Sequence, residues 1–159
     1  MEKPNFKTGF GYDVHKFSSD RKLILGGVEI PYSFGLEGHS DADVLLHAVC
    51  DSILGAAGFS DIGNQFPNTD PDFKDISSLV LLKKSYELIK HEGWKIGNID
   101  CVVILEEPKI NKYSDDMKKN ISEILETDFI SIKATTSEGI GFVGRKEGCV
   151  AYCTSLIYK

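Results

Sequence analysis

The pattern of apolar and polar residues near the start of the chain is that of a β-strand. Over residues 6–17, large apolar side chains alternate with a second set that contains Gly9, Gly11, Asp13 and His15. Because successive side chains of a strand point to opposite faces, this second set shares one face. A carboxylate and an imidazole therefore project side by side, next to two positions where the backbone is bare.

The rest of the chain alternates between helical and extended patterns. Residues 22–30 predict a hairpin that turns at two glycines, and residues 61–75 predict a loop because prolines and aspartates recur there. The expected helices cover residues 40–57, 76–92 and 114–126, and the expected later strands cover residues 98–105, 129–136 and 148–158. This order predicts a single domain over residues 1–159 of the α+β class, with a mixed four-stranded sheet, helices packed on one face and a small hairpin.

The first predicted helix carries signals at both ends and an unusual polar stripe. Ser40 is a good N-cap with Asp43 three residues later, and Gly58 suits the C-terminal end. Asp43, His47 and Asp51 stand four residues apart, so they lie above one another on one face. Such a stripe is most often a solvated face, but this one lacks lysine, arginine and glutamate and consists of residue types that bind metals.

The strand and the helix together offer the donor set of a catalytic zinc site. Two imidazoles and one carboxylate with an open fourth position are typical of such sites, and Asp13, His15 and His47 supply them if the strand lies beside the helix. Asp43, Asp51 or a backbone carbonyl would then orient a ligand histidine by accepting a hydrogen bond from the ring nitrogen that does not bind the metal. The alternative is an ordinary Asp–His pair at a strand end beside a solvated helix face.

Two further segments have the chemistry of phosphate binding. His39 and Ser40 stand at the expected helix start, where free amide groups and the helix dipole favour an anion. Thr135 and Thr136 end an apolar strand, where their hydroxyls can donate to phosphate oxygens, and Glu138 could hold a hard cation such as magnesium. The alternative for this second segment is an ordinary polar strand end.

Composition narrows the choice of partners. The formal net charge of −6 disfavours nucleic acid as a partner. Any bound phosphate must therefore be held locally, by a metal, a helix N-terminus or a few basic side chains. The sequence has neither a signal-like run at its N-terminus nor an apolar stretch of membrane-spanning length. This predicts no membrane association and a cytoplasmic location, or a plastid-type organelle if the chain is a processed form. The four cysteines are expected to be buried thiols, because a metal pair at Cys149 and Cys153 would lack a second pair of ligands.

One motif is a decoy. Gly139, Gly141 and Gly144 match the dinucleotide-binding fingerprint and follow a predicted strand. The fingerprint functions only where it opens a helix inside a longer strand–helix–strand unit. Residues 148–158 predict a strand instead, so we reject a nicotinamide-dependent enzyme.

Several short motifs follow one another along nearly the whole chain. They are GYDVH at 11–15, GHSDAD at 38–43, DIG at 61–63, FP at 66–67, TDP at 69–71, PK at 108–109, ATTSE at 134–138 and GR at 144–145. Taken together, they resemble the 2-C-methyl-D-erythritol 2,4-cyclodiphosphate synthase family. Independent motifs in one order are far more specific than any one of them.

The resemblance implies a homotrimer with its active sites between neighbouring subunits. It matches Asp13, His15 and His47 to zinc ligands, in agreement with the donor set described above. It also matches Glu138 to a ligand of a second divalent cation, magnesium or manganese.

The resemblance further implies where a substrate would bind. It places the phosphates at His39 and Ser40, the methylerythritol part at Asp61 and Gly63, and the cytidine diphosphate end at Leu105, Pro108, Lys109, Ile110, Ala134 and Thr136. Phe142, Arg145 and Glu147 match residues around the threefold axis, where an isoprenoid diphosphate is a candidate occupant of the trimer cavity.

The implied activity is that of a phosphorus–oxygen lyase in the non-mevalonate route to isoprenoid precursors. Such an enzyme converts 4-diphosphocytidyl-2-C-methyl-D-erythritol 2-phosphate to 2-C-methyl-D-erythritol 2,4-cyclodiphosphate and CMP. The 2-phosphate attacks the β-phosphorus of the same molecule, and metals offset the repulsion between the two anions. Three alternatives stay open: a metal-dependent phosphohydrolase acting on a cytidine diphosphate ester, a non-enzymatic trimeric binding protein, and a cytidine nucleotide-binding module.

Overall fold

The computed structural model describes residues 5–67 and 69–159, so the first four residues of the N-terminal segment lie outside the described part. The strands are β1 (Phe6–Ser18), β2 (Leu23–Leu25), β3 (Val28–Ile30), β4 (Gly35–Leu36), β5 (Lys95–Ile104), β6 (Ile130–Thr135) and β7 (Gly148–Tyr158). The helices are α1 (Val44–Ala57), α2 (Ile62–Gln65), α3 (Ser78–His91), α4 (Ser114–Leu125) and α5 (Gly141–Gly144), with short 3-10 turns at Pro71–Phe73 and Asn111–Tyr113.

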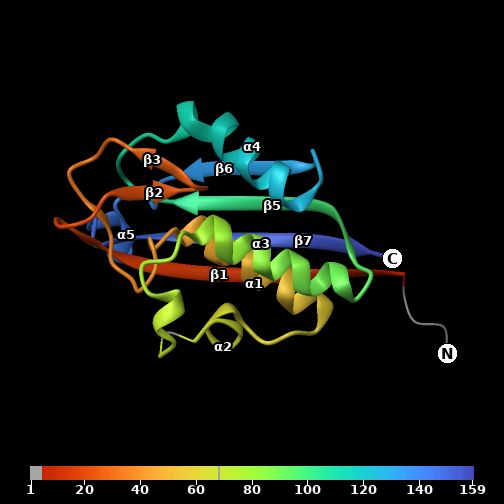
Figure 1. The fold of residues 1–159 in the computed structure, drawn as a ribbon. Helices are drawn as coiled ribbons and strands as arrows, with labels where there is room; N and C mark the ends of the chain where they lie inside the picture. The colour runs from red at the N-terminus through yellow and green to blue at the C-terminus, as the bar shows by residue number, and fades with distance from the viewer. Residues whose placement is uncertain (1–4, 68) are drawn as a thin grey trace.

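The strands form a mixed sheet in the order β4-β1-β7-β5-β6, and β2 pairs with β3 in a separate hairpin. Within this sheet only the β5–β6 pair is parallel, whereas β1 pairs with β4 and with β7, and β5 pairs with β7, in the antiparallel sense. Helices α1, α3 and α4 lie over one face of the larger sheet (Figure 1). The predicted α+β class and hairpin are confirmed.

The predicted number of strands is wrong, because the sheet has five strands rather than four. The fifth, β4, consists of two residues that pair with Phe17 and Ser18 at the end of β1. A pairing of that length has no period that could be recognised in the sequence.

The backbone of β1 lies directly against α1. A Cβ atom added to Gly11 would lie 1.9 Å from the carbonyl oxygen of Ala48, and one added to Gly9 would lie 1.8 Å from that of Ser52. No real side chain fits at such distances, so only glycine permits this approach. The close contact brings the face of β1 that carries Asp13 and His15 up to α1.

Helix α1 begins at Val44, so the predicted N-cap at Ser40 is wrong. The cap is Asp43, whose carboxylate accepts a hydrogen bond of 3.0 Å from the amide of Leu46. Ser40 instead accepts from the amide of Ala42 at 3.1 Å, and Ala42 has a φ of 56°, which is outside the helical region. At the other end Gly58 has a φ of 91° and caps the helix as predicted.

Asp43 also ties the β2-β3 hairpin to the start of α1. Its two carboxylate oxygens accept from the amides of Gly26 at 3.0 Å and Gly27 at 2.7 Å. Burial raises the pKa of Asp43 to about 6, although these amides and that of Leu46 favour the charged form. The expectation that Asp43 orients a ligand histidine is therefore corrected, because both of its oxygens are used by backbone amides.

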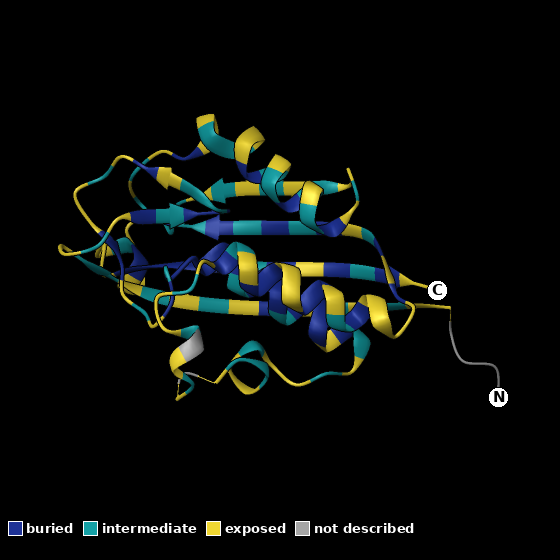
Figure 2. Cartoon of the chain, viewed as in Figure 1, coloured by how far each residue is buried: buried dark blue, intermediate teal, exposed yellow. Residues whose placement is uncertain are grey.

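The core lies between the sheet and the helices, and α1 is at its centre. Ten of the fourteen residues of α1 are buried, since the helix packs on β1 and β7 and is in turn contacted by α3 (Figure 2). Its apolar residues Leu45, Ala48, Val49 and Ile53 are all fully buried. The four cysteines are buried free thiols, as expected.

Two further element starts differ by two or three residues from the predicted ones. Helix α3 begins at Ser78 behind a Ser77 cap rather than at residue 76, and β5 begins at Lys95 rather than at residue 98. Two four-residue helices, α2 and α5, lie in segments that showed no helical period. Since α5 is followed directly by β7, the glycine motif does not open a long helix, which agrees with its rejection as a dinucleotide site.

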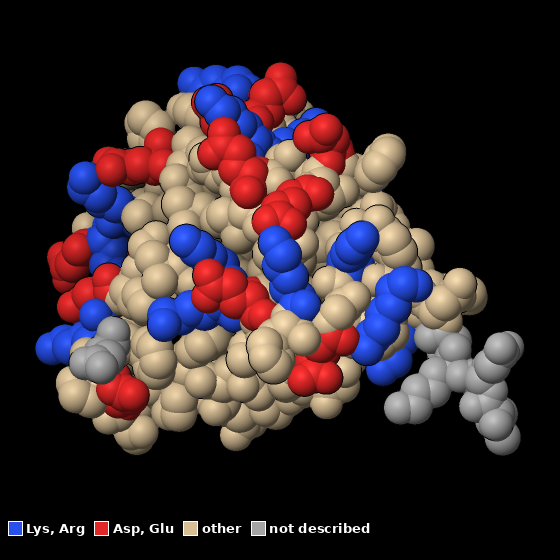
Figure 3. Space-filling view, turned by 45° about the vertical axis from the view of Figure 1, so that its right-hand side comes forward, with Lys and Arg blue, Asp and Glu red and all other residues tan. Residues whose placement is uncertain are grey.

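The surface of the described chain mixes charges of both signs. On the face shown in Figure 3, acidic and basic side chains are interspersed rather than gathered into separate areas. No helix in residues 5–67 and 69–159 combines the length and apolar character that a membrane crossing needs.

The glycine contact between β1 and α1 predicts the outcome of a matched pair of substitutions. Gly11→Ala should destabilise the fold by about 1–3 kcal/mol or more, because the added methyl would force β1 away from α1. Gly55 lies on α1 itself, and a Cβ atom added there would meet open space. Gly55→Ala should therefore raise the free energy of unfolding by up to about 1 kcal/mol. Urea unfolding of both variants checks this, and equal shifts for the two would contradict the proposed role of the contact.

Candidate functional site

Asp13, His15 and His47 meet at one point between β1 and α1. One carboxylate oxygen of Asp13, Oδ2, lies 2.9 Å from His15 Nε2 and 2.9 Å from His47 Nδ1. The two ring nitrogens are 3.2 Å apart, and the rings meet edge to face with their centroids separated by 5.3 Å. This is the only group of three or more acidic, histidine or cysteine ligand atoms gathered within 4.8 Å in the described part of the chain.

The spacing of the three atoms fits a tetrahedral zinc ion. With metal–ligand bonds of about 2.0–2.1 Å, neighbouring corners of a tetrahedron are about 3.3 Å apart. The observed separations of 2.9, 2.9 and 3.2 Å are close to this edge. The donor set has three protein ligands, so a fourth position is left for a substrate or water. The residues present therefore fit a catalytic metal of this kind.

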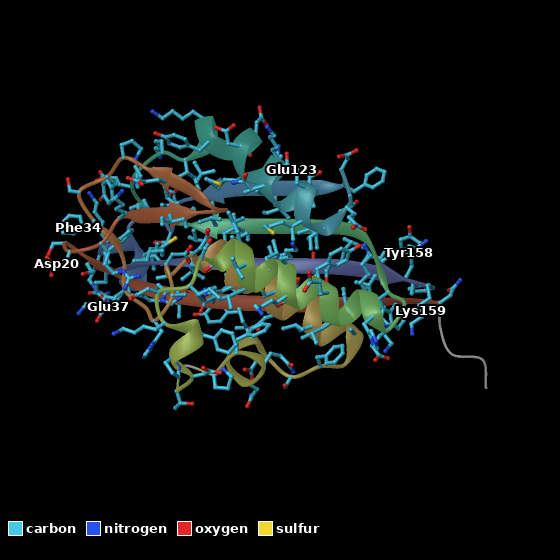
Figure 4. The ribbon with its side chains drawn as sticks, viewed as in Figure 1. Asp20, Phe34, Glu37, Glu123, Tyr158 and Lys159 are labelled. Carbon is cyan, nitrogen blue, oxygen red and sulfur yellow. The ribbon has the colours of Figure 1, made fainter. Side chains whose placement is uncertain are left out.

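A backbone carbonyl orients His15. Its Nδ1 lies 2.6 Å from the carbonyl oxygen of Glu37, which can only accept, so Nδ1 carries the proton. The lone pair of Nε2 is thereby directed at Asp13 and the cluster. Glu37 lies near the end of the sheet opposite Tyr158 and Lys159 (Figure 4), so the cluster sits at that end. A carbonyl as the orienting group was one of the sequence-based expectations, and for His15 it is confirmed.

Two hydroxyl groups face the other side of His47. Its Nε2 lies 3.0 Å from Ser40 Oγ and 2.9 Å from Ser78 Oγ, whereas its Nδ1 faces Asp13. The two histidines therefore present different ring nitrogens to the cluster, Nε2 from His15 and Nδ1 from His47.

Asp13 and His15 each shift the pKa of the other toward its charged form. Burial raises the pKa of Asp13, but the interactions with the His15 and His47 rings outweigh it and lower the pKa to about 2. Burial lowers the pKa of His15, but Asp13 outweighs it and the net shift is upward from 6.5. Asp13 is thus an anion at any pH near neutrality, which is the state that a metal requires.

The cluster opens into a pocket of about 160 Å³. The lining includes three side chains or backbone positions predicted to contact substrate, namely His39, Ser40 and Gly63. Asp61 does not line this pocket, because its carboxylate caps α2 by accepting from the amide of Asn64 at 2.9 Å.

The expected anion site at the start of α1 needs correction. Ser40 lies four residues before Val44, and the carboxylate of Asp43 already caps the helix. His39 and Ser40 reach the pocket from the loop that precedes the helix, so any phosphate there would meet their side chains and the cluster rather than the free amides of α1.

Asp51 has a different role from the expected one. Its carboxylate accepts from the amide of Ile62 at 2.8 Å and so holds the first turn of α2, which carries Gly63. Burial raises its pKa, and so do the nearby carboxylates of Asp61 and Asp13. Asp51 positions the wall of the pocket instead of hydrogen bonding to a ligand histidine.

A second pocket, of about 240 Å³, lies at the end of β5 and β6. All six residues predicted to hold a cytidine diphosphate line it: Leu105, Pro108, Lys109, Ile110, Ala134 and Thr136. Asn111 and Thr135 line it as well, so the phosphate candidates Thr135 and Thr136 belong to this pocket and not to the first.

Glu138 lies apart from the metal cluster within one chain. It follows β6 in a turn, has a φ of 55°, and accepts from Thr136 Oγ1 at 3.0 Å. Strands β1 and β6 are separated by β7 and β5. Three strand spacings place β1 and β6 about 14 Å apart across the sheet.

The three residues predicted around a threefold axis gather at α5. Arg145 donates from Nε to Glu147 Oε1 at 2.7 Å, and from a terminal nitrogen to Oε2 at 3.4 Å. Phe142 lies on α5 itself and is 40 % exposed. The pairing with Glu147 raises the pKa of Arg145, so the group stays charged.

Residues 6–158 match the profile of the YgbB family. The chain belongs to the YgbB family. It is 60 % identical over 144 residues to the 2-C-methyl-D-erythritol 2,4-cyclodiphosphate synthase of Clostridium acetobutylicum, which covers 89 % of this chain and 93 % of that protein. Its identity to the protein of the same name from Bacillus subtilis is 53 % over 156 residues, covering 97 % and 99 %.

Solved YgbB-family structures have the same fold. An IspF from Plasmodium falciparum, a CDP complex, superimposes with a TM-score of 0.85 at 35 % identity and covers 98 % of both chains. The bifunctional IspDF from Campylobacter jejuni superimposes with a TM-score of 0.92 at 43 % identity. The match covers 96 % of this chain but 42 % of the bifunctional one. The resemblance predicted from the motifs is confirmed.

Sequence reasoning missed three residues that support the centre of this YgbB-family chain. Arg21 donates to the carbonyl of Gly38 at 2.8 Å and to that of Ser40, and so fixes the loop that orients both histidines. Ser78 contacts His47, and Asp41 contacts Ser78. The motif at 38–43 contains Asp41 but gives it no partner, and neither Arg21 nor Ser78 stands in any recognisable metal-binding spacing.

Removal of one ligand provides the test of the centre. His47→Ala should weaken zinc binding by more than the roughly 10–100-fold expected for loss of an outer partner, since one of three protein ligands is gone. The measurement is a zinc titration in competition with a chromophoric chelator. His91→Ala is the matched control, because the His91 side chain is 90 % exposed near the end of α3. Equal zinc affinities of the two variants would refute the assignment.

Proposed function

We propose that this chain converts 4-diphosphocytidyl-2-C-methyl-D-erythritol 2-phosphate to 2-C-methyl-D-erythritol 2,4-cyclodiphosphate and CMP. The observation that carries the proposal is the meeting of Asp13, His15 and His47 in a chain of the YgbB family. The relatives named above are cyclodiphosphate synthases at high identity over nearly their whole length. The enzyme is thus a phosphorus–oxygen lyase of isoprenoid precursor biosynthesis by the non-mevalonate pathway.

The residues of the first pocket suit the reacting end of this substrate. The nucleophile is a phosphate that is already an anion near neutral pH, so the main difficulty is to bring two anions together in line. Zinc held by Asp13, His15 and His47 would supply positive charge at the diphosphate. His39 and Ser40 would contact the phosphates from the preceding loop, and Gly63, with Asp61 beside it, would contact the methylerythritol part.

The residues of the second pocket suit the nucleotide end. The Plasmodium falciparum IspF described above is a CDP complex, which supports a cytidine diphosphate ligand for this chain. Leu105, Ile110 and Ala134 would offer apolar contact to the base, and Lys109 a positive charge. The hydroxyls of Thr135 and Thr136 would donate to the diphosphate.

A second cation completes the proposal. Glu138 would hold magnesium or manganese, which prefer oxygen ligands. Two cations that share one diphosphate lie only about 3.5–4 Å apart in two-metal sites. The strands that lead to the two candidate positions, β1 and β6, are about 14 Å apart across the sheet of one chain, by three strand spacings. The active site is therefore proposed to join the zinc pocket of one subunit with the nucleotide pocket of its neighbour in a homotrimer.

The uncovered face of the sheet supports this assembly. Phe10, Tyr12 and Val14 point away from α1 and are 63 %, 44 % and 40 % exposed. Tyr152 of β7 adds to them, with its ring centroid 5.1 Å from that of Tyr12. An apolar surface of this kind on the flat side of a sheet is typical of a subunit interface.

Further parts of the proposal follow from the same assembly. Phe142, Arg145 and Glu147 would lie around the threefold axis, and an isoprenoid diphosphate would suit a cavity with an apolar wall and a cationic mouth. The whole span of residues 1–159 would act as one synthase domain. A cytoplasmic location stays a prediction, and the bacterial relatives named above support it.

The rival reaction is hydrolysis of the cytidine diphosphate ester by a water molecule. In ¹⁸O-labelled water with zinc and magnesium present, the cyclase should yield CMP and a cyclic diphosphate without label from the solvent. Mass spectrometry and ³¹P NMR of the cytidine substrate check both products. The His47→Ala protein prepared in the same way serves as the blank for contaminating hydrolases. Label in either product, or no conversion at all, would rule the proposal out.

The trimer predicts a mass close to three times the chain mass of 17.6 kDa. Val14→Asp places a charge on the uncovered sheet face and should shift the protein to monomers in sedimentation velocity at micromolar concentration. Val80→Asp is the matched control, because Val80 is 42 % exposed on α3, on the opposite side. If Val14→Asp stays trimeric, the interface lies elsewhere.

A further inference from the structure

The buried hydroxyl of Ser78 lies between His47 and Asp41. Ser78 is fully buried, and its Oγ lies 2.9 Å from His47 Nε2 on one side and in hydrogen-bonding contact with Asp41 Oδ1 on the other. The amide of Ser78 also donates to Asp41 Oδ2 at 3.0 Å. The carboxylate of Asp41 thus accepts hydrogen bonds from both the hydroxyl and the amide of Ser78.

The number of protons on these groups fixes the direction of each hydrogen bond. A hydroxyl has one proton, and an ionised carboxylate has none. Ser78 therefore donates its proton to Asp41, and its oxygen can only accept from His47. Nε2 of His47 must then carry a proton, and in the neutral ring the lone pair lies on Nδ1. Ser40, the other hydroxyl near Nε2, does not decide the matter because it can donate as well as accept.

This direction determines whether His47 can bind a metal. The lone pair on Nδ1 faces Asp13 and His15, where the metal ligands converge. With the proton on Nδ1 instead, the ring would present a hydrogen atom to the cluster. The carbonyl of Glu37 fixes His15 in a comparable way from its own side.

We propose that Asp41 and Ser78 are positioning residues that hold His47 in the tautomer required for metal binding. The inference rests on the proposed metal centre and adds two residues to it. Neither residue contacts the cluster atoms directly, because Asp41 acts through Ser78 and Ser78 acts through the remote nitrogen of His47.

The sharpest variant is Asp41→Asn, which changes neither the size of the side chain nor any group that touches His47. The oxygen of the amide is expected at the Ser78 amide, whose 3.0 Å contact is shorter than the 3.3 Å contact from the amide of Asp43. The NH₂ group then faces Ser78 Oγ as a donor. Ser78 would turn its own proton toward His47 Nε2, which favours the proton on Nδ1.

The first measurement is zinc affinity, from competition with a chromophoric chelator. Asp41→Asn and Ser78→Ala should each bind zinc roughly 10–100-fold more weakly than the unmodified protein. Ser85→Ala is the matched control, since Ser85 is equally buried on the same helix but two turns further along. It should bind zinc normally, and thermal melts report whether each variant is folded.

The second measurement reads the tautomer without any metal. In chelator-treated protein labelled with ¹⁵N-histidine, at about pH 8.5 where free imidazole is neutral, the ¹⁵N shifts of His47 show which nitrogen carries the proton. The unmodified protein and Ser85→Ala should carry a proton on Nε2, and Asp41→Asn should lose the proton at Nε2 and carry it on Nδ1. This readout does not respond to a general loss of stability.

The two measurements separate the possible failures. If the unmodified protein bound no zinc, the proposed metal centre would fall, and the ¹⁵N shifts would still decide the tautomer. If folded Asp41→Asn and Ser78→Ala bound zinc as tightly as Ser85→Ala, with His47 protonated on Nε2 throughout, the positioning role would be overturned. Weaker binding together with a shifted proton in Asp41→Asn supports it.

Discussion

The close contact between the bare backbone of β1 and helix α1 is the constraint on which the rest of the structure depends. Gly9 and Gly11 let the strand lie against carbonyl oxygens of the helix at a distance that no side chain permits. Asp13 and His15 continue the same face of the strand, and His47 lies on the helix beside them. This contact holds together a candidate ligand set drawn from segments more than thirty residues apart. The packing of the core therefore determines the geometry of the candidate metal centre.

The polar stripe of α1 is explained by three separate attachments. Asp43 binds amides of the β2-β3 hairpin, His47 joins the cluster, and Asp51 binds the first amide of α2. The stripe was expected to serve one site, yet each residue fixes a different segment around that site. Lysine or glutamate would suit a solvated face, whereas these positions are enclosed by a hairpin, a strand and a short helix. The absence of long charged side chains from the stripe follows from that enclosure.

The sequence allowed the regular elements and the metal ligands to be predicted, because both depend on local periods and residue types. The period of two in β1 placed Asp13 and His15 on one face, and the family resemblance named six residues that the structure brings together in the second pocket. The loop contacts could not be predicted in this way. Arg21 holds two carbonyls, Asp43 replaces Ser40 as the cap, and Asp41 grips Ser78, which is 37 residues away. Each depends on which backbone groups the tertiary fold leaves unpaired, and no spacing in the sequence records that.

The division of the proposed chemistry across the sheet gives a physical reason for assembly. The metal cluster is attached to β1 and the nucleotide pocket to the ends of β5 and β6, with β7 between them. Moving the two together within one chain would require the central strands of the sheet to be removed. A neighbouring subunit that packs on the uncovered face of β1 and β7 avoids this, since it can bring its own β6 end to the cluster without disturbing either sheet. The aromatic side chains on that face would then be buried by the same contact that completes the site, so stability of the assembly and catalytic competence would be lost together.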